Sequence, residues 1–213
     1  HTRFMSNSKQ RRVALMEMRE DKLVEHSTGE VQRMVRQAMA ALVELGVRPG
    51  DRVCILVPTS LTHTVIDVAA LCVGGVVVPV YDTDSVEQIS WIVEDAQPVV
   101  FVAVRDAIGR VRAAVDSERH HCLIVEAEQL ESDFRSEAGE HDTTLTIHEP
   151  RESDPACIVY TSGTTGRSKG CVLTHENITS AVDGAHGALL ELFSDVQRTV
   201  LFLPLAHVFA RVV

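Results

Sequence analysis

Short apolar runs that are typical of buried strands alternate along this chain with longer segments of helical periodicity. The predicted strands cover residues 53–57, 76–80, 99–104, 122–125, 157–160, 171–173 and 199–203. The predicted helices cover residues 30–45, 61–73, 85–96, 106–115 and 176–192. Strands that alternate with helices over short loops favour a parallel sheet. We therefore expect an α/β fold with a mostly parallel sheet flanked by helices on both faces.

Composition divides the chain into four parts. We expect a leader or expression remnant at 1–26, a first α/β subdomain at 27–130, an acidic linker or surface loop at 131–155, and the truncated start of a second α/β part at 156–213. The first part is polar and charged, with at most a weak helix between Arg11 and Val24. The segment from Glu131 to Asp154 contains eight acidic and two basic residues, and its strand-like sequence is confined to 143–147. This composition is typical of a solvated loop, and an acidic docking surface is the alternative.

Charge and hydropathy exclude several classes of protein. Thirty acidic and twenty basic residues give a net charge of −10, which argues against a nucleic-acid partner because phosphates require a clustered basic surface. The longest apolar stretch, 68–81, has 14 residues and contains glycine and proline, whereas a membrane span needs roughly 20. Five cysteines occur singly, without the spacing of a disulfide or zinc framework. We therefore expect reduced core thiols in a cytoplasmic protein.

The segment 160–170, with the sequence YTSGTTGRSKG, carries the chemistry. It follows a predicted buried strand and contains three glycines, five Ser or Thr hydroxyls and two cations. Glycines let backbone N–H groups approach an anion, hydroxyls donate to phosphate or complete a magnesium shell, and lysine stabilises phosphoryl charge. The segment therefore indicates a phosphate-binding loop, and a flexible surface hairpin is the alternative.

A P-loop of the form G-x-x-x-x-G-K-[ST] fits this segment only in part. Lys169 lies six residues after Gly163, as that motif requires. Ser168 replaces the second glycine, however, and Gly170 replaces the hydroxyl that would hold magnesium. The following residues 171–173 also favour a strand over a helix. A P-loop phosphotransferase is therefore the lesser interpretation.

The loop and four other segments resemble the motifs of the adenylate-forming (AMP-binding) superfamily, which includes acyl-CoA synthetases, luciferases and amino-acid adenylation domains. In chain order the matching segments are 45–53, 75–81, 160–170, 173–178 and 203–209. The resemblance extends from about Val31 to Val213. Residues 80–92 are most similar to the long-chain fatty acyl-CoA synthetase branch. The expected fold is thus part of the large N-terminal domain of such an enzyme.

The resemblance implies roles for individual residues. Family members join a carboxylate to ATP, release pyrophosphate, and pass the acyl group to coenzyme A. The residues that match the phosphate loop, and would hold the β- and γ-phosphates, are Thr161, Ser162, Gly163, Thr164, Thr165, Gly166 and Lys169. Thr165 is the expected Mg²⁺ ligand, and Lys169 would also act in catalysis. His207 matches a histidine near the acyl and adenylate site, with a histidine at a helix start as the alternative.

Other side chains receive structural interpretations. We expect Trp91 to pack in the core, as is usual for a large apolar residue on a helix. Arg167 and Ser168 match variable positions of the family loop, so we expect them to be solvated. We expect Thr174 to cap a helix that begins near His175. His175 is therefore interpreted as a residue at a helix start and not as a catalytic residue.

The resemblance implies that a protein carrying this chain is a fatty acid–CoA ligase with ATP, Mg²⁺ and coenzyme A as its cofactor and co-substrates. The later family motifs are absent, and the chain stops at Val213 inside an apolar run, so we expect an N-terminal fragment that cannot complete adenylation alone. A non-catalytic nucleotide-binding or structural fragment is one alternative. Adenylation of an amino or aryl acid is another. Acyl chain length, peripheral membrane contact and homo-oligomer formation stay open.

Overall fold

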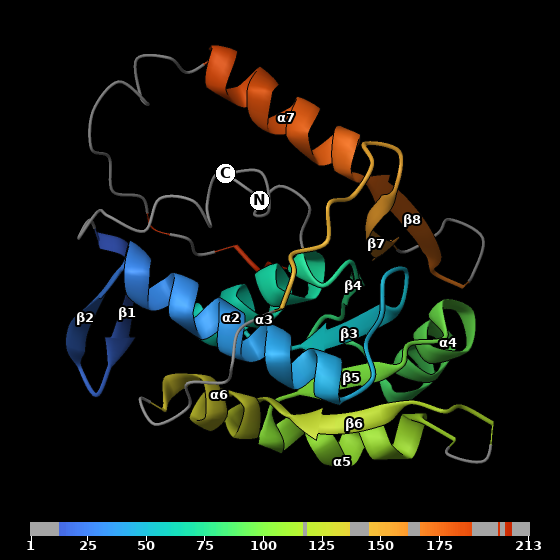
Figure 1. The fold of residues 1–213 in the computed structure, drawn as a ribbon. Coiled ribbons are helices and arrows are strands. Elements are labelled where there is room, and N and C mark those ends of the chain that lie inside the picture. Colours follow the sequence, from blue (N-terminus) through green and yellow to red (C-terminus); the bar gives the residue numbers. More distant parts are fainter. Residues whose placement is uncertain are drawn as a thin grey trace.

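Six strands form one sheet in the order β6-β5-β3-β4-β7-β8 (Figure 1). The computed structural model describes residues 13–116, 119–136, 145–161, 167–188, 200 and 203–205. The strands of this sheet are β3 (Arg52–Leu56), β4 (Val76–Pro79), β5 (Val100–Ala103), β6 (Leu123–Glu126), β7 (Pro155–Thr161) and β8 (Lys169–Thr174). Every pairing among the five strands β3, β4, β5, β6 and β7 is parallel, whereas the edge strand β8 pairs antiparallel with β7. The predicted mostly parallel sheet is therefore confirmed.

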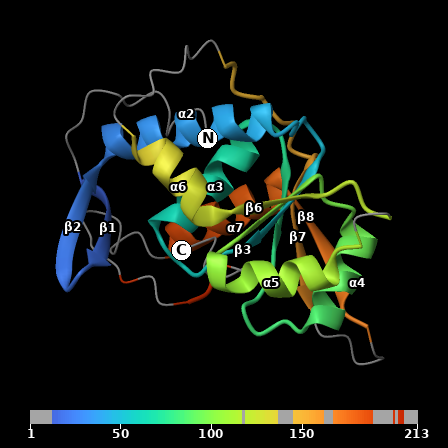
Figure 2. The same ribbon diagram turned by 90° about the horizontal axis from the view of Figure 1, so that it is seen from below.

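Helices cover both faces of the sheet. They are α2 (Thr28–Glu44), α3 (Leu61–Cys72), α4 (Val86–Ala96), α5 (Arg105–Ala114), α6 (Ala127–Arg135) and α7 (His175–Ala188). Apolar residues of α2, α3 and α6 form one buried cluster, and those of α4 and α5 form a second. Figure 2 shows these two helical layers on opposite sides of the strands.

Alternate strand residues supply the two clusters, because successive side chains of a strand point to opposite faces. In β3, Val53 and Ile55 join the α2–α3–α6 cluster, whereas Cys54 and Leu56 join the α4–α5 cluster. All four residues are buried, which explains why the strands read as continuous apolar runs.

Serine caps fix where three helices begin. Ser27 and Ser85 each form a capping box, with Glu30 and Gln88 respectively, and the Ser60 side chain caps α3. The predicted N-cap at Ser85 is thus confirmed. Gly46, at φ +91°, follows the end of α2, where the left-handed conformation favours glycine.

Residues 13–27 differ from the expected weak helix. They form a β-hairpin of β1 (Val13–Arg19) and β2 (Lys22–Ser27), which turns at Glu20 and Asp21 with φ of 46° and 61°. The contacts of Glu17 in β1 hold this charged hairpin in place. Its Oε1 accepts a hydrogen bond from Arg135 Nη2 at 2.9 Å, and His26 Nε2 lies at the same distance. The hairpin is therefore tied to α6 by an ion network that the local sequence pattern does not reveal.

We expect Glu17→Gln to lower the free energy of unfolding at neutral pH by about 1–3 kcal/mol, because a charge-assisted hydrogen bond is lost. Burial alone would raise the pKa of Glu17, but the hydrogen bonds from Arg135 and His26 outweigh it and lower that pKa below 4.5. The stabilisation is therefore present above the unfolded pKa and is lost as the pH falls through the folded pKa. Urea unfolding at several pH values should show the difference between wild type and variant shrink in acid. The exposed Glu149→Gln is the control, and an equal loss in that variant would contradict the assignment.

The acidic segment 131–155 begins differently from the expected linker. Residues 131–135 complete α6, whose buried face consists of Ala127, Leu130 and Phe134. Residues 145–147 form no strand, although Leu145 and Ile147 pack against the core, and residues 143–144 lie outside the described residues. The four-part division of the chain stays a prediction, but β7 pairs with β4 and so extends the same sheet.

The five cysteines are free thiols, and Cys54, Cys72 and Cys157 are buried. Cys171 on β8 is exposed, so the expectation of core cysteines is wrong for that residue. Within the described part of the chain, no helix has the length and apolar character that crossing a bilayer requires. The helix predicted for 176–192 is described only as α7, to Ala188, and most of the strand predicted for 199–203 lies outside the described residues.

Candidate functional site at the end of β7

Strand β7 ends at Thr161 and β8 begins at Lys169, and these two residues face each other as a pair in the antiparallel register. Both side chains are exposed. Because β7 is parallel to β4, this pair lies at the carboxyl edge of the parallel strands, where open α/β sheets bind ligands. The structure therefore brings together two of the predicted phosphate-binding residues. The structure also confirms that a strand follows the loop, as predicted, whereas a P-loop would be followed by a helix.

The other predicted site residues lie outside the described residues. They are Ser162, Gly163, Thr164, Thr165, Gly166 and His207. We use the term loop shoulders for the described residues on either side of 162–166, namely 160–161 and 167–169. The contacts of these shoulders define the part of the site that the structure describes.

Tyr160 and Gly170 form the cross-strand pair next to Thr161 and Lys169. A Cβ atom added at Gly170 would lie 2.8 Å from Ile158 Cγ2 and 3.2 Å from Tyr160 Cζ. The Tyr160 ring therefore packs directly over the glycine backbone. Glycine is required here because any side chain would displace the ring or Ile158.

We expect Gly170→Ala to lower the free energy of unfolding by about 1–3 kcal/mol through overpacking. Gly109→Ala is the matched control, because Gly109 is exposed within α5 and nothing lies within 4 Å of its added Cβ. That change should instead raise stability by about 0.5–1 kcal/mol, as alanine is the better helix former. Urea unfolding of both variants gives the comparison, and equal shifts of the same sign would contradict the packing described.

The Tyr160 hydroxyl donates a hydrogen bond of 2.6 Å to Asp95 Oδ2 on α4. Burial of the phenol raises the pKa of Tyr160, and the neighbouring Asp95 carboxylate raises it further. Tyr160 is therefore a neutral donor at physiological pH, and it joins the first loop shoulder to α4.

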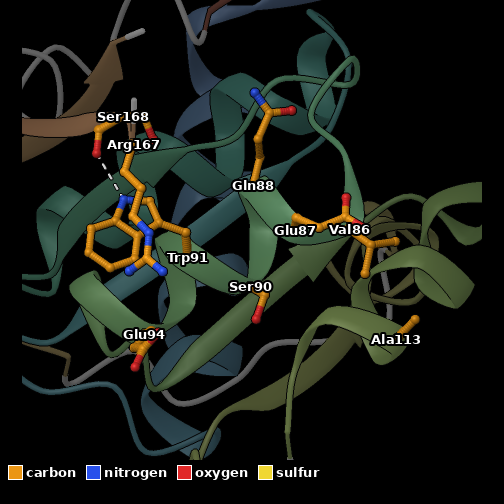
Figure 3. Close-up of a pocket in the computed structure, with 9 residues that line it drawn as sticks. All are labelled: Val86, Glu87, Gln88, Ser90, Trp91, Glu94, Ala113, Arg167 and Ser168. Atoms are coloured by element: carbon orange, nitrogen blue, oxygen red, sulfur yellow. Dashed lines mark hydrogen bonds between the residues drawn. The ribbon is translucent and has the colours of Figure 1, made fainter. Parts of the chain in front are cut away.

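Trp91 of α4 holds the second loop shoulder. Its indole Nε1 donates a hydrogen bond of 2.8 Å to the backbone oxygen of Ser168, and the Arg167 guanidinium lies 4.5 Å from the ring centroid (Figure 3). The expectation that Trp91 packs in the core is therefore wrong, because its ring is only partly buried and serves these contacts. Arg167 is exposed as expected, but it stacks on Trp91 rather than standing free in solvent.

A surface hollow of about 560 Å³ lies on the α4 side of the second loop shoulder. Figure 3 shows the residues that line it, which are Val86, Glu87, Gln88, Ser90, Trp91, Glu94, Ala113, Arg167 and Ser168. The stacked pair of Trp91 and Arg167 forms part of the lining of this hollow. Sequence reasoning identified neither Trp91 nor Asp95 as part of the site. Their spacing of four residues places them on one helix face but does not reveal what that face meets.

A second predicted motif begins at the same edge of the sheet. Thr59, in the loop that follows β3, donates a hydrogen bond of 3.0 Å to the backbone oxygen of Leu203 and accepts one of 3.0 Å from the backbone N–H of Leu205. Since β3 and β7 belong to the same parallel set, both loops leave the sheet at its carboxyl edge. The segment that leads to His207 is therefore anchored at the edge that carries the phosphate loop.

The predicted cap of α7 is confirmed. Thr174 donates its backbone N–H to Asn177 Oδ1 at 3.0 Å, and its Oγ1 accepts from the Asn177 N–H at 3.2 Å. His175 is the first residue of α7. No group of three His, Cys, Asp or Glu side chains in the described ranges could hold a metal ion.

Comparisons with known proteins place the sequence of this chain in a family. The family model for AMP-binding enzymes matches residues 4–213. The long-chain-fatty-acid–CoA ligase FadD15 of Mycobacterium bovis is 37% identical over 192 residues, which cover 86% of this chain and 32% of the relative. The 4-coumarate–CoA ligase-like 9 of Arabidopsis thaliana is 32% identical over 184 residues, covering 85% of this chain and 32% of that protein. The chain thus spans about a third of the length of these relatives.

The fold also matches solved structures. The ATP-bound RpMatB-BxBclM chimera B1 superposes with a TM-score of 0.79 at 22% identity, covering 98% of this chain and 42% of the other. At this level of identity the likeness concerns the fold alone. It agrees with the expected placement of the chain in the N-terminal domain of an adenylate-forming enzyme.

Proposed function

Because the chain belongs to the AMP-binding enzyme family, we propose that the protein carrying it activates a carboxylic acid with ATP and then transfers the acyl group to coenzyme A. The observation that carries this proposal is the pairing of Thr161 with Lys169 at the carboxyl edge of the sheet. A hydroxyl and an ammonium group face solvent there, on either side of a loop rich in glycine and hydroxyl residues. These are the groups that binding of a polyphosphate requires.

In the proposed first step, a carboxylate oxygen attacks the α-phosphorus of ATP. The bond from the α-phosphorus to the bridging oxygen breaks, and pyrophosphate leaves with the electron pair. The chain's contribution is to position the β- and γ-phosphates and to neutralise charge on the leaving group, which we assign to Lys169. In the second step, the coenzyme A thiolate attacks the acyl carbon and AMP leaves.

Magnesium would neutralise further phosphate charge when bound with ATP. Hard oxygen ligands suit this ion, and the loop offers hydroxyls of that kind, including the exposed Thr161 at its described end. We assign the ligand role to Thr165. His207 is proposed to lie near the acyl group, since the segment that precedes it is anchored by Thr59.

We propose a long-chain fatty acid as the acid substrate. The 37% identity to a relative named as a long-chain-fatty-acid–CoA ligase supports this class, and a relative named as 4-coumarate–CoA ligase-like at 32% identity makes an aryl acid the competing class. The cytoplasmic location, and the absence of activity in the 213-residue chain by itself, stay predictions.

The experiment is ATP–pyrophosphate exchange by the protein that carries this chain, with palmitate, octanoate, 4-coumarate and an amino acid as alternative substrates. We expect exchange to depend on the added acid and to be fastest with palmitate. Fastest exchange with 4-coumarate would replace the substrate class and keep the reaction. No exchange with any acid would overturn the proposed reaction.

A further inference from the structure

We propose that helix α4 positions the phosphate loop, with Trp91 and Asp95 as positioning residues that each hold one loop shoulder. This inference rests on the proposed function, because it assigns a purpose to contacts around residues that would bind ATP. Neither residue is proposed to touch the substrate.

The two contacts occur directly beside the residues that would bind phosphate. Asp95 accepts the hydrogen bond from Tyr160, which precedes Thr161, and Trp91 donates to Ser168, which precedes Lys169. A shift of either shoulder would therefore move the phosphate-binding residue next to it. Since positioning errors of about 1 Å can cost about 10²-fold in rate, such control has catalytic consequences.

Helix α4 is held firmly enough to serve as a reference. Its N-terminus is closed by the capping box of Ser85 and Gln88, and its inner face buries Ile89, Ile92, Val93 and Ala96. At its C-terminus, Arg52 at the start of β3 donates hydrogen bonds of 2.7 Å to the Ala96 carbonyl and 2.8 Å to the Gln97 carbonyl. The C-terminus and the inner face of the helix are thus tied to the sheet, and its N-terminus is closed by its own cap.

The stack of Arg167 on Trp91 adds a second contact at the second shoulder. It holds one loop cation against Trp91, at the surface hollow that both side chains help to line. Among the described residues no carboxylate forms an ion pair with Lys169, the other loop cation. The arrangement leaves the Lys169 ammonium available at the loop, where phosphate would bind.

The test uses calorimetric titration of the protein that carries this chain with ATP and, separately, with AMP. Trp91→Phe keeps an aromatic ring for Arg167 but removes the indole N–H together with the second ring. It should weaken ATP binding by about three- to ten-fold, as expected for one hydrogen bond, leave AMP binding unchanged and lower Tm only slightly. Ser90→Ala, which alters the hollow without touching the loop, should change neither affinity.

The hydrogen bond at the first shoulder is tested by changing each of its partners, Asp95 and Tyr160. Asp95→Ala and Tyr160→Phe should each reduce ATP affinity by a similar factor, and the double variant should be no worse than either, because the same hydrogen bond is removed. Asp95→Asn retains an acceptor oxygen and should rescue binding.

Wild-type ATP-to-AMP affinity ratios in Trp91→Phe and Asp95→Ala would overturn the positioning role, even if the protein forms acyl-adenylate. Equal weakening for ATP and AMP, or a loss of Tm that accounts for the effect, would assign these residues a purely structural role and overturn it as well. Failure of the proposed function would show itself separately, as absence of acid-dependent exchange in the wild-type protein.

Discussion

Replacing Lys169 by alanine in the protein that carries this chain should slow acyl-adenylate formation roughly 10²- to 10³-fold, the usual cost of removing one preorganised electrostatic stabiliser. Lys169 begins β8 opposite Thr161, at the edge of the sheet where the loop leaves β7. Pyrophosphate carries more negative charge as it leaves than it does within ATP. The ammonium group therefore stabilises the transition state more than the ground state, and the loss should appear mainly in kcat.

The measurement is the rate of pyrophosphate release under saturating ATP and acid. Lys22→Ala is the matched control, because Lys22 is an exposed lysine on the β1–β2 hairpin and contributes nothing to the site. Lys169→Arg keeps the charge but replaces a point charge by a planar fork, so we expect only partial activity. An unchanged rate in Lys169→Ala would remove the assigned role.

Replacing Phe101 by alanine should lower the free energy of unfolding by about 3–5 kcal/mol. Phe101 lies in β5, is 0% exposed, and belongs to the cluster that packs α4 and α5 against the sheet. Truncation there leaves a cavity beneath both helices, and the close-packed strands on either side of β5 restrict how far the site can collapse.

Equilibrium unfolding in urea measures this effect. Leu123→Ala on the neighbouring strand β6 is the control, since that side chain is 51% exposed and its loss should cost much less. A loss for Phe101→Ala as small as that for Leu123→Ala would contradict the buried packing of β5. A changed slope of unfolding free energy against urea would instead indicate an altered unfolded state.

The central part of the fold could be predicted because its strands are buried on both faces. Runs such as 53–57 and 99–104 then contain almost no polar residues, and the intervening helices carry an apolar stripe. Helix α6 could also have been predicted from its apolar stripe, since Ala127, Leu130 and Phe134 follow helical spacing. Its acidic surface residues instead led to the expectation of a loop.

The N-terminal hairpin could not be predicted from local pattern. Its turn residues, Glu20 and Asp21, take positive φ without a glycine, so the usual hairpin sequence is missing. Glu17 is held by Arg135, which lies 118 residues farther along the chain. Only the folded chain brings the two together.

The site divides in the same way. The antiparallel pairing that sets Thr161 opposite Lys169 was not predicted. The order of a strand at 157–160, a loop at 160–170 and a second strand at 171–173, however, follows from the sequence pattern. The support from α4 does not, because Trp91 and Ser168 are separated by 77 residues and Asp95 and Tyr160 by 65. Helical spacing placed Trp91 and Asp95 on one face, and only tertiary packing determines that this face meets the loop shoulders.

The identity of the products formed from ATP tests the proposed reaction most directly. With palmitate and coenzyme A supplied to the protein that carries this chain, ³¹P NMR should show AMP and pyrophosphate accumulating in equal amounts, and neither should form without the acid. Formation of ADP and inorganic phosphate would indicate phosphoryl transfer from the γ-position and would contradict attack at the α-phosphorus.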